Sequence, residues 1–165
     1  MKIGKGVEWA AHTCALLALL PPGDALPGEA LADFLGVPPP YLAKQLQALS
    51  RAGIVSAKRG AAGGYRLSRL AETISLWDIT AAIEGTAPSF RCTEVRRSGP
   101  CGASPKECSG PCTIAAAFQR AESGYRDALS EVRLHDLVAG IAGDSTPARK
   151  RRILEWIENN AARAA

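Results

Sequence analysis

Apolar residues in the first third of the chain recur at the three- and four-residue spacing of amphipathic helices. Pairs of prolines and a Pro-Gly step separate these runs. The pattern predicts three helices, at residues 5–20, 29–36 and 39–52. Gly36 ends the second and Gly53 the third, because glycine tolerates the left-handed conformation that commonly closes a helix.

The spacing then changes to that of strands. Residues 54–58 and 65–68 predict two short strands on either side of the glycine-rich turn RGAAGG. Three helices followed by a basic β-hairpin is the element order of a winged helix-turn-helix. We therefore expect a mainly α fold with a small β-hairpin.

A further helix is predicted at residues 73–85. Ser75 is placed to cap its start, and Gly85 to end it. We assign residues 1–85 to a winged helix-turn-helix DNA-binding domain and residues 86–112 to a cysteine-rich loop that is a candidate cluster-binding segment.

The loop is followed by a long helix, and we assign residues 113–138 as a dimerisation helix. Its apolar positions step by four and three residues, which is the spacing of a coiled-coil seam. An equivalent partner helix is the favoured contact, and packing against the helix's own domain is the alternative. The remaining tail, 139–165, holds a basic run and an amphipathic helix. The seam consists of Ile114, Phe118, Ala121, Tyr125, Ala128 and Val132.

Charge is uneven along the chain. Residues 1–70 hold 8 Lys and Arg against 4 Asp and Glu, whereas residues 71–165 hold 12 of each kind. A basic N-terminal part is typical of contact with phosphates. The sequence lacks a nucleophile–base set, a phosphate loop or paired carboxylates, so we expect no enzyme and no small-molecule substrate. No apolar run is long enough for a membrane span, and five cysteines at metal-like spacing favour a reducing, cytoplasmic compartment.

The third helix and the hairpin carry the candidate DNA-reading residues. Leucines line one face of the helix, while cations, amides and a phenol line the other, and such side chains can contact base edges and phosphates. Glycines in the hairpin turn allow close approach to a groove. The candidates are Tyr41, Lys44, Gln45, Gln47, Ala48, Arg51, Lys58, Arg59, Gly63, Gly64 and Tyr65.

Four of the five cysteines fall in the polar loop, at Cys92, Cys101, Cys108 and Cys112. Thiols gathered in this way can ligate a metal or pair with each other. None of the gaps is a CxxC, so spacing alone does not choose between an iron–sulfur cluster, zinc and a disulfide. Cys14 lies on the apolar face of the first helix, where packing is its expected role.

The stretches YLAKQLQALSRAGIVSAKRGAAGGYRLSR and TISLWDITAAIEG, followed by a cysteine loop and a long helix, resemble the iron–sulfur winged-helix repressors. These are the IscR-like, NsrR-like and RirA-like regulators, and the resemblance covers about residues 1–138. It implies a homodimer on a palindromic operator in double-stranded DNA. The recognition helix would be 39–51, in the major groove, and the wing 58–65, in the minor groove. Ala115 stands where IscR-like members carry a His ligand, so their ligand set cannot be transferred whole.

A redox-sensing subset of this family is similar to the chain at the first helix. It pairs an acidic residue and a His there with the first and last loop cysteines. The resemblance therefore implies a 2Fe–2S cluster held by Cys92 and Cys112 of one subunit and by Glu8 and His12 of the other. It implies a regulator, acting as a repressor, that responds to redox state or nitric oxide.

Two other functions remain open. In the first, Cys101 and Cys108 lead a thiol–disulfide or zinc switch in a winged-helix regulator without a cluster. In the second, the chain is an iron–sulfur or interaction module that does not bind DNA.

Overall fold

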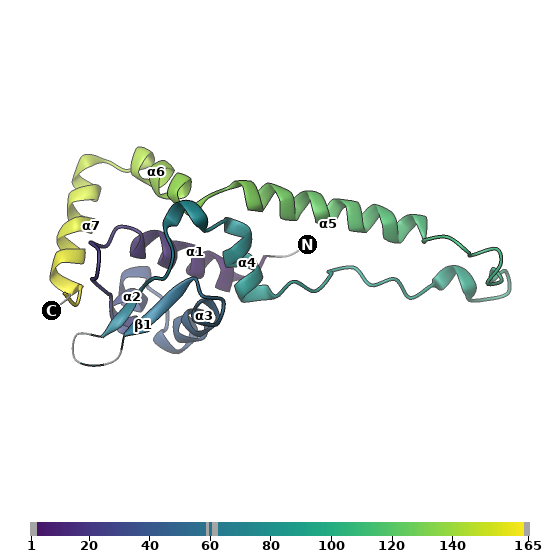
Figure 1. Ribbon diagram of the computed structural model, residues 1–165, viewed down its shortest axis with the longest axis horizontal. Helices are drawn as coiled ribbons and strands as arrows, with labels where there is room; N and C mark the ends of the chain where they lie inside the picture. The colour runs from purple at the N-terminus through teal and green to yellow at the C-terminus, as the bar shows by residue number, and fades with distance from the viewer. Residues whose placement is uncertain (1–2, 59, 61–62, 164–165) are drawn as a thin grey trace.

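The computed structural model describes residues 3–58, 60 and 63–163. The elements are α1 (Lys5–Leu17), α2 (Gly28–Leu35), α3 (Pro39–Arg51), β1 (Val55–Lys58), β2 (Gly64–Leu67), η1 (Ala71–Thr73), α4 (Leu76–Glu84), η2 (Val95–Arg97), α5 (Thr113–Glu131), α6 (Leu134–Asp144) and α7 (Pro147–Asn160). Figure 1 shows a body from which α5 and the segment before it extend together; we call residues 86–131 the arm. The predicted mainly α fold with a β-hairpin is confirmed.

The body is built around α3. Its leucines at 42, 46 and 49 are almost completely buried, as the apolar spacing predicted. Helices α1, α2 and α4 all pack against it. Ile74 and Leu134 close the same core from the segments that precede α4 and begin α6. Burying this apolar surface is the main term that stabilises the body.

Three of the predicted helix ends are confirmed. Gly36 closes α2 in the left-handed conformation, at φ 63°. Ser75 caps α4: its Oγ accepts a hydrogen bond from the Asp78 backbone N–H at 3.0 Å, and the Asp78 carboxylate accepts one from the Ser75 N–H at 2.9 Å. This reciprocal pair satisfies two helix-end donors. Gly85 ends α4 at φ 84°.

The two strands form an antiparallel hairpin in which Val55 faces Leu67 and Lys58 faces Gly64. A third segment joins this hairpin, because Leu26 and Tyr65 exchange backbone hydrogen bonds of 3.0 and 2.8 Å. The hairpin is therefore fastened to the loop before α2 rather than standing free.

The predicted dimerisation helix, 113–138, is interrupted. Helix α5 ends at Glu131, and α6 starts at Leu134. Between them the backbone becomes extended and pairs with the segment that precedes α4: the Leu76 N–H donates to Val132 at 2.9 Å, and the Leu134 N–H donates to Ile74 at 2.9 Å. These bonds hold the base of the arm against the body.

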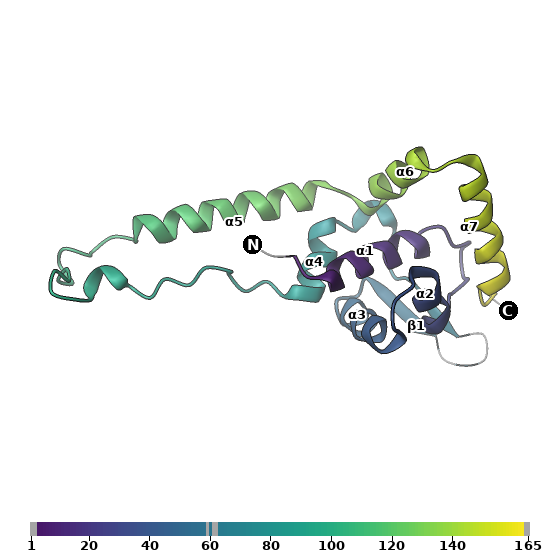
Figure 2. The same cartoon turned by 180° about the vertical axis from the view of Figure 1, so that it is seen from behind.

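The tail is part of the body. Helix α7 lies along α2, where Trp156 contacts Phe34 at a centroid distance of 4.7 Å. Beyond it, Ala162 exchanges two backbone hydrogen bonds with Ala25. Figure 2 shows α7 beside the body at the end opposite the arm. Within the described residues, no helix combines the length and apolar character needed to cross a membrane.

Candidate DNA-binding face and cysteine arm

The solvent face of α3 presents most of the predicted reading residues. Prolines open its first turn, where the missing N–H groups cost nothing. Tyr41 is 62% exposed, and Lys44, Gln47 and Arg51 are exposed along the same side. Ala48 is half-buried among them. The helix therefore offers cations, an amide and a phenol around a small residue.

Gln45 differs from its neighbours on α3. It is half-buried, and its amide lies 3.0 Å from where a side chain on Gly6 of α1 would begin. Tyr41 also contacts α1, since its ring meets that of Trp9 edge-on at 6.5 Å. The start of the candidate recognition helix is therefore in direct contact with α1.

The wing presents Lys58 to solvent, and Arg59 lies outside the described residues. The other predicted wing residues have structural contacts. A side chain on Gly64 would stand 2.6 Å from the backbone of Leu26, and the Tyr65 ring lies against Gly28 at the start of α2. Gly63 is half-buried and donates to the Gly60 carbonyl at 2.8 Å. These contacts position the wing relative to α2.

All five cysteines are free thiols in different environments. Cys14 is completely buried, and this burial raises its pKa from 9.0 to about 12. Cys108 is also buried, whereas Cys101 is exposed. Cys92 lies in the segment that leads out along the arm and is exposed, whereas Cys112 lies directly before α5 and is half-buried.

The arm brings Cys92 and Cys112 together although they are 20 positions apart. Cys112 is the N-cap residue of α5. Its pKa is lowered, chiefly by the nearby backbone N–H group of Ala115 and then by that of Ile114, with further contributions from the Cys92 thiol and the Arg96 guanidinium. Helix N-termini favour thiolates in this way. The lowered pKa favours the thiolate form of Cys112, which is the form that binds metals.

Two arginines hold the tip of the arm in shape. Arg96 donates to the carboxylate of Glu94 at 2.8 Å and to the Gly110 carbonyl at 2.7 Å. Arg97 donates to the Cys108 carbonyl at 3.4 Å. The loop between the cysteines is thus ordered by contacts across it.

Glu8 and His12 lie one turn apart on α1, and both are exposed. In the single chain they are not brought to the arm's cysteines: Figure 1 shows the tip of the arm far from α1. Among the described residues, no group of three or more His, Cys, Asp and Glu side chains is arranged to hold a metal ion. The structure thus assembles two of the four predicted ligands at the arm tip and two on the body.

The base of the arm carries a cluster that the sequence analysis did not identify. The Arg126 guanidinium lies 5.2 Å above the ring of Trp77 on α4, donates to the Thr86 carbonyl at 3.0 Å and pairs with Glu122 at 2.8 Å. Glu122 also accepts from the Ser89 N–H at 3.2 Å. We call these five residues the arm latch. The Glu122–Arg126 spacing of four residues was the one sequence signal available for it.

The predicted seam of α5 divides into two parts. Its inner part packs on the body, where Tyr125 meets Trp77 edge-on at 6.4 Å. Its outer part is open: Ile114 is 64% exposed and Phe118 is 52% exposed, although Phe118 stacks on Phe90 at 4.4 Å. The contact with the chain's own domain therefore accounts for Tyr125 and Val132 of the seam, whereas Ala121 and Ala128 are exposed.

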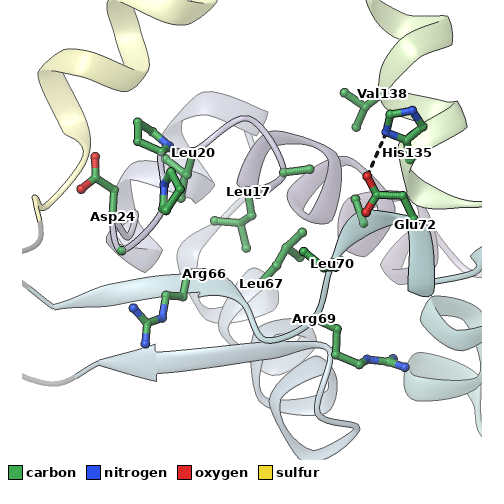
Figure 3. A pocket seen from close by; sticks show the side chains of 15 residues that line it. Leu17, Leu20, Asp24, Arg66, Leu67, Arg69, Leu70, Glu72, His135 and Val138 are labelled. Atoms are coloured by element: carbon green, nitrogen blue, oxygen red, sulfur yellow. Dashed lines mark ion pairs between the residues drawn. The ribbon is translucent and has the colours of Figure 1, made fainter.

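The other histidine has an acidic partner. A concavity of about 380 Å³ lies between β2, η1, the end of α1 and α6. Figure 3 shows the side chains that line it. His135 lies 3.5 Å from Glu72 at one side of it, and the arginines Arg66 and Arg69 border it from the hairpin side. His135 is thus separate from both the arm and the α3 face.

Comparison with known proteins agrees with this geometry. The Rrf2 family, described as iron-dependent transcriptional regulators, matches residues 3–140. The transcriptional repressor NsrR of Streptomyces coelicolor is 29% identical over 144 residues, which cover 87% of this chain and 92% of that protein. These relatives are transcriptional regulators, as the sequence predicted, and not enzymes.

Solved structures have the same fold. The IscR of T. potens superposes with a TM-score of 0.66 at 20% identity, covering 88% of this chain and 93% of that one. The oxidised form of Staphylococcus aureus CymR superposes with a TM-score of 0.61 at 25% identity, covering 84% and 96%. Since the family match spans most of its length, the chain belongs to the Rrf2 family of winged-helix transcriptional regulators.

Proposed function

We propose that this regulator is a cytoplasmic, DNA-binding homodimer, acting as a repressor, that senses redox state or nitric oxide through a 2Fe–2S cluster. Cys92 and Cys112 of one protomer and Glu8 and His12 of the other are its ligands. The meeting of the Cys92 and Cys112 thiols at the arm tip carries the proposal. Of the other two arm thiols, Cys108 is buried and Cys101 is exposed.

The donor set fits such a cluster. Two thiolates are the usual ligands of iron–sulfur centres, and imidazole in place of a thiolate raises the reduction potential. When bound, the cluster supplies a one-electron redox couple. Helix α5 has 19 residues, so its length is about 28 Å, and this separates the arm's sulfurs from α1 of the same chain. With this ligand set, a second protomer supplies Glu8 and His12.

Exposed apolar residues support the dimer. Ile114 and Phe118 lie on the outer half of α5, close to Cys112, and remain uncovered in one chain. Large apolar side chains left open beside a binding site are typical of interaction surfaces. A partner that brings its α1 to the arm tip would cover them.

DNA contact is assigned to α3 and the wing. The cations and amides of α3 face solvent, and Lys58 extends the same basic character to the hairpin. Helix α1 connects the two functions, because it carries Glu8 and His12 and also touches Tyr41 through Trp9. Two recognition helices must match the half-site spacing of the operator, so a small change in how α1 meets the partner's arm alters binding.

One observation favours a second candidate, a thiol switch without a cluster. Cys92 lies near enough to Cys112 to contribute to the lowering of its pKa. An oxidant such as a peroxide or a disulfide could take two electrons, and the two thiols would lose two protons as one S–S bond forms. Among the structural relatives is the oxidised form of CymR. The pair concerned is Cys92 and Cys112, rather than the predicted Cys101 and Cys108.

Subunit mixing tests the proposal most directly. One variant carries Cys92→Ser and Cys112→Ser, and the other carries Glu8→Ala and His12→Ala. We expect each homodimer, purified anaerobically, to lack the visible absorption, iron and sulfide of the wild type. The heterodimer contains one intact set of four ligands, so it should recover half of the wild-type cluster.

Two results count against the proposal. A heterodimer without a cluster means that the ligands do not come from two chains, and a colourless wild type supports the thiol switch instead. Cys101→Ser is the matched control, because it removes an exposed thiol of the same arm and should leave the cluster unchanged. Binding of the loaded protein to a selected operator duplex should fall steeply with salt, as phosphate contacts require.

A further inference from the structure

Arg96 bridges the two chain segments of the arm that carry the proposed cysteine ligands. Its Nε donates to Glu94, two residues after Cys92, and its Nη2 donates to the carbonyl of Gly110, two residues before Cys112. The side chain is 29% exposed, so it is partly shielded from water. A permanent positive charge is therefore held between the two strands that bear the thiols.

Glu94 brings a negative charge to the same place. Its carboxylate lies 3.7 Å from the Cys92 sulfur, and its backbone N–H donates to that sulfur at 3.4 Å. Among the described residues it is the sole non-glycine with a positive φ, at 54°. Such a conformation is disfavoured and needs support from its surroundings. Arg96 provides support, because it binds the Glu94 carboxylate from the other side.

We propose, resting on the function above, that Arg96 sets the reduction potential of the cluster held by Cys92 and Cys112. Reduction adds one negative charge, and a nearby fixed cation stabilises the reduced form. Arg96 also neutralises the Glu94 carboxylate, which would otherwise oppose that charge. Charge and hydrogen bonding at the ligand sulfurs are known determinants of such potentials. Arg96 acts on the cluster through its charge and through the position of Glu94, and it is not itself a ligand.

The raised pKa of the Arg96 guanidinium agrees with this placement. The main cause is its hydrogen bond to Glu94, and the sulfurs of Cys108 and Cys112 contribute through their charge. Arg97 is the natural comparison. It has the same charge, is more exposed at 45%, and lies 3.7 Å from Glu94, but it bonds to the Cys108 carbonyl and not to the strand next to Cys112.

The test is a mediated redox titration of the loaded, full-length protein, followed by visible absorption. We expect Arg96→Gln to lower the equilibrium constant for reduction about tenfold, a shift of about 59 mV for one electron. Arg97→Gln, the matched loss of one charge, should change it less than about threefold. Glu94→Gln should raise the constant, and Arg96→Lys, which keeps the charge, should stay within about threefold of the wild type.

Several outcomes overturn the inference. It fails if the loaded Arg96→Gln protein shifts no more than Arg97→Gln. It also fails if Glu94→Gln does not raise the reduction potential, or if Arg96→Lys lowers the potential as far as is expected of Arg96→Gln. These two variants decide the test if Arg96→Gln does not retain a cluster. A wild type that binds no cluster overturns the proposed function and this inference together, whereas an unaltered potential in loaded Arg96→Gln overturns this inference alone.

Discussion

Gly64 is the position where one methyl group should separate the wing from the body. It begins β2 at φ 159° and lies directly over Leu26. An added Cβ would stand 2.6 Å from both the carbonyl carbon and the carbonyl oxygen of Leu26, and 3.0 Å from its nitrogen. These are backbone atoms, which cannot rotate away as a side chain can. In Gly64→Ala, the loop before α2 and the hairpin must therefore move apart.

The cost follows from what that movement breaks. Leu26 and Tyr65 exchange two backbone hydrogen bonds, of 3.0 and 2.8 Å. Each contributes a net of about 0.5–1.5 kcal/mol. A non-glycine residue in a disfavoured backbone region adds about 1–3 kcal/mol. Together these terms lower the free energy of unfolding by about 2–6 kcal/mol.

Urea unfolding followed by far-UV circular dichroism measures this loss. Gly53→Ala is the matched control: Gly53 also has a positive φ, of 67°, but no atom lies within 4 Å of its added Cβ. We expect Gly53→Ala to cost about 1–2 kcal/mol, from backbone strain alone. If Gly64→Ala costs no more than Gly53→Ala, the packing of the hairpin on Leu26 does not hold the wing and the reasoning is wrong. In the folded fraction, operator affinity should also fall, because the wing is displaced.

Three other changes test separate parts of the structure. Burial raises the pKa of the Cys14 thiol from 9.0 to about 12, so as the pH rises the unfolded chain loses this proton before the folded chain does. The free energy of unfolding should therefore fall by up to about 1.4 kcal/mol per pH unit between these two pKa values. Urea unfolding at several pH values measures this fall, which should be smaller in Cys14→Ala. Trp156→Ala should lower the free energy of unfolding by about 2 kcal/mol, because the ring packed against Phe34 is lost; urea unfolding with and without the substitution measures it. Arg126→Gln should leave global stability nearly unchanged but speed limited proteolysis just after α4, since the latch on Trp77 is released.

The sequence was sufficient where a local rule decided the structure. The spacing of Leu42, Leu46 and Leu49 identified the buried face of α3, and the remaining positions followed from helix geometry. Ser75 and Gly36 marked helix ends because capping depends on residues only a few positions apart. Agreement between pattern and propensity made these predictions firm.

It was insufficient where distant segments meet. Spacing did not choose between the loop thiols, because the contact of Cys92 with Cys112 depends on how the whole arm turns back on α5. The pairing of Ala25 with Ala162 joins the two ends of the chain and has no local signal. The close approach of Gly64 to Leu26 likewise has no local signal, and its predicted contact with DNA stays a prediction.

Helix α6 was missed for a different reason. Its sequence, LHDLVAGIAGD, contains two glycines, which lower helix propensity, and it follows α5 after a gap of only two residues. What interrupts the helix is the backbone pairing of Val132 and Leu134 with the segment before α4. The heptad pattern alone predicts a continuous helix here, and a tertiary contact ends it at Glu131.

That boundary gives the proposed sensor a route from the arm tip to the α3 face. The latch and the backbone pairing fix α5 at one end, against α4, which in turn packs on α3. With a length of about 28 Å, α5 moves by about 2 Å at its far end for a tilt of about 4° at its base. In the proposed dimer the partner's α1 would hold the tip, and a change of about 2 Å in ligand position would then correspond to the same tilt of the body. Because operator half-sites have fixed spacing on the duplex, the proposed dimer predicts that such a rotation changes operator affinity.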